Sequence, residues 1–114
     1  TSGKAAKIIK FADENKIALY SPISVKIELS KVLQREMKFT PEEIVAIFEG
    51  LPVKWMEKEI YEWALEKTKV KHKADKPIEA LASILNCGIL TAGKHFDNVK
   101  NKLDVNDVLE KLEL

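Results

Sequence analysis

A tryptophan flanked by lysines provides the clearest suggestion of chemistry in this sequence. The apolar residues around it predict a helix, and at 100° per residue Trp55 stands roughly 140° away from the apolar stripe. Lys54 and Lys58 flank it, and Tyr61 falls on the same outer half. Because exposed rings stack on bases and ammonium groups hold phosphates, we predict DNA binding by these four residues. The alternative places Trp55 against another helix, since tryptophan is highly buried on average. Trp63 is expected in the core.

A second predicted site is the segment 67–76, which contains five lysines and one aspartate, a net charge of +4. Lysines alternate along its centre and would hold a polyanion such as a triphosphate. Glycines at 88 and 93 predict a turn into a helix whose free N-terminal amides suit a phosphate. The nucleotide-binding candidates are Lys69, Lys71, Lys73, Lys94, His95 and Asn98. A solvated linker and a plain helix–helix turn are the respective alternatives.

The other polar residues predict neither a catalytic centre nor a metal site. Ser2-Gly3-Lys4 lacks the first glycine, the preceding strand and the following Ser or Thr of a phosphate loop. His72 and His95 have no ligand partner at i+4. Cys87 is the single cysteine, which excludes a disulfide framework, and it is expected to be a buried small hydrophobe. We therefore predict no enzyme activity for the chain on its own. Mg²⁺ would arrive only with a bound nucleotide such as ATP.

The size and composition predict one soluble, cytoplasmic domain. The chain has 114 residues, of which 46% are hydrophobic and 32% charged. No apolar run approaches the roughly 20 residues that cross a bilayer. The sequence begins with threonine, which suggests a piece excised from a longer protein.

Apolar spacing near 3.6 predicts helices almost throughout the chain. Thr40-Pro41-Glu42-Glu43 is a capping box, and Asp104 is expected to cap the last helix. Residues 23–29 also alternate as a strand would, but the helical period continues beyond them. The expected fold class is all-α, a compact bundle of six to seven short helices, with two small helical subdomains possible. Its single domain comprises an N-terminal helix group at 1–67, a basic loop at 68–76 and a C-terminal helix group at 77–114.

The whole chain resembles the small helix-bundle domain that follows the catalytic core in primase-polymerases of archaeal plasmid replication proteins. The segments that carry the resemblance are IIKFADENKIALYSPISV at 8–25, LPVKWMEKEIYEWALEK at 51–67 and ILNCGILTAGKHF at 84–96. It implies a module that binds the single-stranded DNA template together with ATP and helps the neighbouring core to start a primer. That core, with its metal-binding carboxylates, would belong to the same longer chain.

Two alternative functions follow from the charge pattern. Residues 36–66 carry a net charge of −5 and could dock on a basic protein partner, with Trp55 and Tyr61 as anchors. A helix expected over 91–103 could instead read duplex DNA. With three lysines and one aspartate it is weakly basic, so this alternative ranks last.

Overall fold

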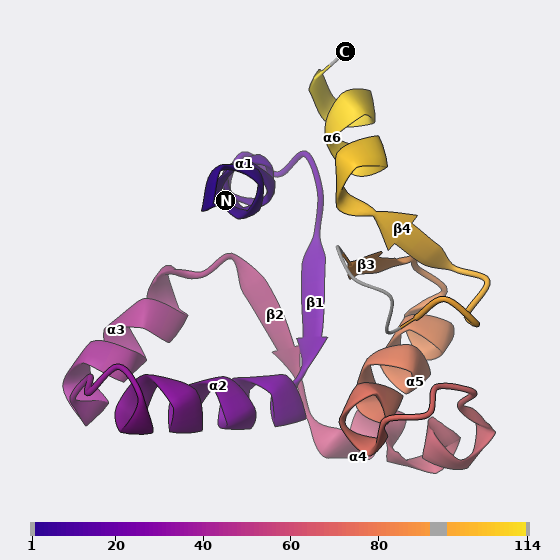
Figure 1. Ribbon diagram of the computed structural model, residues 1–114, viewed down its shortest axis with the longest axis horizontal. Coiled ribbons are helices and arrows are strands. Elements are labelled where there is room, and N and C mark those ends of the chain that lie inside the picture. The colour runs from indigo at the N-terminus through magenta and orange to yellow at the C-terminus, as the bar shows by residue number, and fades with distance from the viewer. Residues whose placement is uncertain (1, 92–95, 114) are drawn as a thin grey trace.

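Helices and short strands alternate along the chain in the computed structural model, which describes residues 2–91 and 96–113 (Figure 1). The helices are α1 (Ser2–Asp13), α2 (Ile23–Arg35), α3 (Pro41–Gly50), α4 (Lys58–Tyr61), α5 (Lys76–Leu85) and α6 (Val105–Glu113). Two 3₁₀ helices are η1 (Glu62–Lys67) and η2 (Lys73–Asp75). The strands are β1 (Leu19–Pro22), β2 (Val53–Met56), β3 (Ile89–Thr91) and β4 (Lys102–Asp104).

The expected all-α fold class is wrong, because the described residues form two small parallel sheets beside the helices. β1 pairs with β2, and β3 pairs with β4. Proline accounts for part of the difference. Pro22 and Pro52 hold the residues that precede them in extended backbone, which favours a strand over a helix at both places. The protein is therefore a mixed α/β fold in which helices predominate.

The helix expected over 91–103 is also corrected. Residues 96–98 form a turn, and the chain enters β4 at Lys102. Parallel pairing of Ile89 with Lys102 and of Thr91 with Asp104 fixes this segment as a strand. A three-residue strand is too short to show an alternating pattern, so its long-range partner decides its structure.

The β1–β2 ribbon separates two groups of helices. In Figure 1, α2 and α3 lie on one side of the ribbon and α5 lies on the other. Side chains alternate between the faces of a strand, so Trp55 contacts Phe48 of α3 while Met56 packs toward the α5 side. On the same face as Met56, Tyr20 of β1 is the register partner of Lys54 of β2, and both of these side chains are exposed.

The core is built around α5. One buried cluster joins Tyr61 and Ala64 to Ala80 and Leu81 of that helix. A second buried cluster has Ala82 of α5 as its helical member, together with Val70, Ile89 and Phe96. Successive positions of α5 thus contact both the 61–70 segment and the β3 segment.

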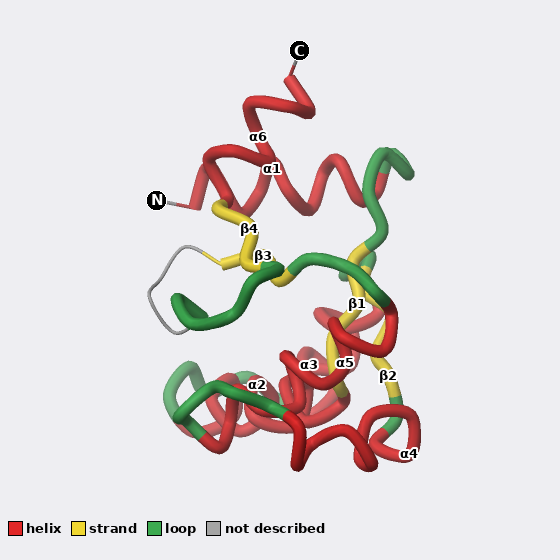
Figure 2. Tube along the Cα trace, turned by 90° about the vertical axis from the view of Figure 1, so that its right-hand side faces the viewer, coloured by secondary structure: helices red, strands yellow, loops and turns green. Residues whose placement is uncertain are grey.

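The two predicted helix caps are confirmed. Thr40 Oγ1 accepts a hydrogen bond from the Glu43 amide at 3.2 Å, and Glu43 Oε1 accepts one from the Thr40 amide at 2.9 Å. Asp104 Oδ1 accepts from the Asn106 amide at 2.8 Å at the start of α6. In Figures 1 and 2, α6 lies beside α1 at one end of the molecule, where Lys7 pairs with Glu113 at 3.4 Å.

Candidate functional site

Trp55 is not the outward-facing ring of a helix, and that expectation is wrong. It lies half-buried in β2, where its ring meets the Phe48 ring edge-on with 5.6 Å between centroids. The Lys26 ammonium lies 5.9 Å from the Trp55 ring centroid, on the side of α2. The indole Nε1 is buried without a hydrogen-bond partner. A base therefore has little ring face to stack on at this position.

The other three predicted DNA contacts are not gathered around Trp55. Tyr61, expected on the outer half of a helix, is 2% exposed and belongs to the core cluster of α5. Lys54 points to the opposite face of β2 from Trp55, and its ammonium lies 5.4 Å from the Tyr20 ring centroid. Lys58 is exposed at the first residue of α4. The four residues of the predicted DNA site therefore do not form one surface. Trp55 and Tyr61, the anchors of the protein-interaction alternative, are both at least half-buried.

Trp63, and not Trp55, is the exposed aromatic ring with a lysine beside it. It is 64% exposed instead of buried, and the Lys67 ammonium lies 5.5 Å from its ring centroid. The helical turn from the end of α4 into η1 places Tyr61 and Ala64, which are three residues apart, on the core side and turns Trp63 away from them. The i, i+3 spacing of those two core residues is the signal in the sequence that could have identified Trp63.

A groove of about 390 Å³ lies next to the exposed Trp63 ring. Its lining comes from η1 and the residue after it on one side and from α5 on the other. The lining residues are Trp63, Ala64, Lys67, Thr68, Glu79, Ala80, Ser83 and Ile84. The groove therefore combines one aromatic ring, one ammonium group, the Glu79 carboxylate and the hydroxyls of Thr68 and Ser83 at the start of the basic segment.

The basic segment 67–76 is held in place and is not a loose linker. Glu79 Oε1 of α5 accepts hydrogen bonds from the amides of Lys69 and Val70 at 2.8 and 2.9 Å. The Val70 side chain is 4% exposed and packs in the second core cluster. With Val70 turned inward, Lys69, Lys71 and Lys73 are exposed to solvent. The anchored backbone therefore holds these lysines at the surface of the protein.

Asn98 and Phe96, from the predicted 88–98 turn, both reach the basic segment. Asn98 Nδ2 donates to the Lys69 carbonyl oxygen at 2.8 Å, and nearby Phe96 packs in the same cluster as Val70. This bond uses one of the two N–H groups of the Asn98 side chain and attaches the 96–98 turn to the basic segment. Lys94 and His95 lie outside the described residues.

The remaining sequence expectations concern cysteine, metals and membranes. Cys87 is exposed, contrary to expectation, because Asn86 turns the chain out of α5 with a φ of 52°. Among the residues that the structure describes, no three His, Cys, Asp or Glu side chains gather as metal ligands would. None of the described helices has the length and apolar character needed to span a membrane.

Comparisons of the chain with family models, with curated proteins and with solved structures found no match. The resemblance to the helix-bundle domain of primase-polymerases accordingly stays a prediction.

Proposed function

We propose that the chain is a non-catalytic module that binds a single-stranded DNA template and ATP beside the catalytic core of a primase-polymerase. The observation that carries this proposal is the exposed ring of Trp63 with the Lys67 ammonium 5.5 Å from its centroid. Base–aromatic stacking contributes about 1–3 kcal/mol per base and tolerates any base. A neighbouring ammonium group provides the charge that a phosphate needs.

The geometry favours a single strand over a duplex. A ring can stack only on a base whose face is free, which is the case in unpaired DNA. The duplex-reading alternative required a basic helix over 91–103, and the described part of that segment is a turn followed by β4. We therefore do not retain that alternative.

The exposed lysines of the anchored segment supply the proposed phosphate contacts. Lys69, Lys71 and Lys73 follow Lys67 along the same stretch of chain, and Glu79 holds the backbone at Lys69 and Val70. The triphosphate of ATP is assigned to these three ammonium groups. Lysine contacts with a single DNA strand release condensed counterions, so the logarithm of the DNA-binding constant should fall by about 0.7 per contacted phosphate for each unit of log salt concentration.

The stacking role is tested by fluorescence anisotropy with a labelled thymidine oligonucleotide. Trp63→Ala should weaken binding roughly tenfold, in line with the loss of one stacked base. Met37→Ala is the matched control, since Met37 is also a large exposed hydrophobe and lies two residues after the end of α2. Equal binding by Trp63→Ala and the unmodified protein at the same salt concentration would overturn the proposal.

The ATP assignment is tested by amide chemical shifts in a titration with Mg²⁺ and ATP. Shifts should concentrate at residues 67–73 and disappear when Lys69, Lys71 and Lys73 are all changed to Gln. A triple change of Lys4, Lys7 and Lys10 in α1 removes the same charge from another exposed surface and serves as the control. Identical shift patterns in the two triple variants would contradict the assignment.

A further inference from the structure

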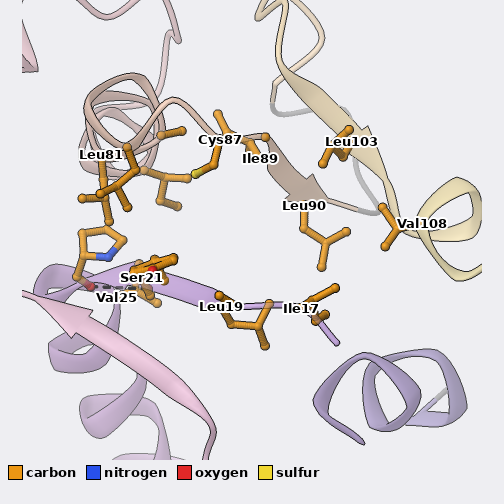
Figure 3. Close-up of a pocket in the computed structure, with 17 residues that line it drawn as sticks. Ile17, Leu19, Ser21, Val25, Leu81, Cys87, Ile89, Leu90, Leu103 and Val108 are labelled. Atoms are coloured by element: carbon orange, nitrogen blue, oxygen red, sulfur yellow. Dashed lines mark hydrogen bonds between the residues drawn. The ribbon is translucent and has the colours of Figure 1, made fainter. Parts of the chain in front are cut away.

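An apolar pocket of about 460 Å³ lies on the other side of α5 from the Trp63 groove. Figure 3 shows its walls: Leu81 comes from α5, Leu19 from β1 and Leu90 from β3. None of the seventeen described residues that line it is Asp, Glu, Lys or Arg. Volumes of about 300–1,000 Å³ with mostly apolar walls are typical of small-molecule sites.

The protein leaves part of this apolar wall uncovered. Tyr20 is 39% exposed and Leu103 is 43% exposed, and both line the pocket. Burying apolar surface contributes about 25 cal/mol per Å², so an apolar ligand that covers these side chains would form a stabilised complex. A polar ligand would lose hydrogen bonds to water there, because the lining offers few donors or acceptors in return.

A positive charge lies next to the exposed wall residue Tyr20. The Lys54 ammonium is 5.4 Å from the Tyr20 ring centroid, and the two residues are paired across β1 and β2. Within the described part of the chain, Lys54 makes no ion pair with a carboxylate. The lining residues that the structure describes are uncharged, so an ionic group of a ligand would have to stay at this rim.

We propose that this pocket binds an amphipathic carboxylate, a molecule with an alkyl chain and one anionic head. The alkyl chain lies among Leu19, Leu81 and Leu90, and the carboxylate pairs with Lys54 in solvent. Charge complementarity at the rim selects an anion over a neutral or cationic molecule of the same length. This site is separate from the proposed DNA surface and does not depend on it.

Decanoate is the probe, used below its micelle-forming concentration. Cys87 lines the pocket, is exposed and is the single cysteine, so its rate of alkylation by iodoacetamide reports occupancy. Decanoate should slow alkylation in a saturable way and should release or absorb heat in calorimetry with the same midpoint. Decanol, which has the same chain without the charge, should bind about two- to fivefold more weakly, as expected for an exposed ion pair.

Two variants test the head group and the pocket separately. Lys54→Gln should weaken decanoate binding about two- to fivefold and leave decanol binding unchanged, whereas Lys58→Gln should affect neither ligand. Ala18→Trp places a large side chain on a lining residue and should abolish protection of Cys87 by both ligands. Equal affinities for decanoate and decanol, or decanoate binding that Lys54→Gln does not change, would overturn the carboxylate assignment. Absence of protection by either ligand in the unmodified protein would overturn the site.

Discussion

The two tryptophans lie eight residues apart and occupy opposite environments. Trp55, in a strand, packs against Phe48 with the Lys26 ammonium close to both rings, whereas Trp63, in a 3₁₀ helix, is 64% exposed beside Lys67. Both are aromatic residues with a lysine close to the ring. What separates them is the backbone: pleated strands alternate side chains, and 3₁₀ helices repeat every three residues. A lysine close to a tryptophan ring is therefore not enough to identify a surface on which bases stack.

Trp55 has a structural role, because its ring is packed against α3. Of the substitutions at Trp55, Glu79 and Trp63, the one at Trp55 should therefore have the largest effect on stability. Trp55→Ala should lower the free energy of unfolding by about 3 kcal/mol, because it leaves a cavity beside Phe48 and removes the contact that joins β2 to α3. Urea denaturation followed by circular dichroism measures this. A loss below 1 kcal/mol would show that the ribbon does not depend on the ring.

Substitution of Glu79 tests whether its carboxylate anchors the backbone of the basic segment. Glu79→Ala should cost about 1–2 kcal/mol of stability, since the amides of Lys69 and Val70 lose their acceptor. Hydrogen exchange at those two amides should accelerate far more than in the rest of the chain. Glu79→Gln keeps an acceptor oxygen and should show a smaller change in both measurements. Unchanged exchange at Lys69 and Val70 in Glu79→Ala would contradict the anchoring role.

Trp63 should have the smallest effect on stability of the three. Trp63→Ala should alter the free energy of unfolding by less than about 0.5 kcal/mol, as expected for an exposed residue, while its DNA affinity falls. The same urea titration that detects the loss in Trp55→Ala measures it. A destabilisation comparable to that of Trp55→Ala would remove the distinction between the two rings.

Local signals in the sequence predicted local structure correctly. The capping box at Thr40 and Glu43 and the cap at Asp104 form as expected, because each depends on residues within one turn. The charge of the 67–76 segment is visible in the sequence, although its anchoring by Glu79 is not. That contact joins residues about ten positions apart and depends on how α5 returns along the segment.

The errors concern segments whose structure is decided by distant partners. Leu19 pairs with Val53, which lies more than thirty residues away, and no helical or strand period over four residues predicts such a pair. A single helix around Trp55, with 100° per residue, therefore predicts the wrong surroundings for Trp55, Tyr61 and Trp63. The chain instead passes through β2, α4 and η1, three elements with different periods.

The most direct measurement uses two proteins with one tryptophan each, titrated with a thymidine oligonucleotide. In Trp55→Phe, Trp63 is the sole reporter, and the buried indole without a hydrogen-bond partner is replaced by a ring that needs none. We expect strong, saturable quenching of fluorescence in this protein and little change in Trp63→Phe, where Trp55 reports. Quenching of Trp55 with no response from Trp63 would contradict the assignment of the stacking surface to η1.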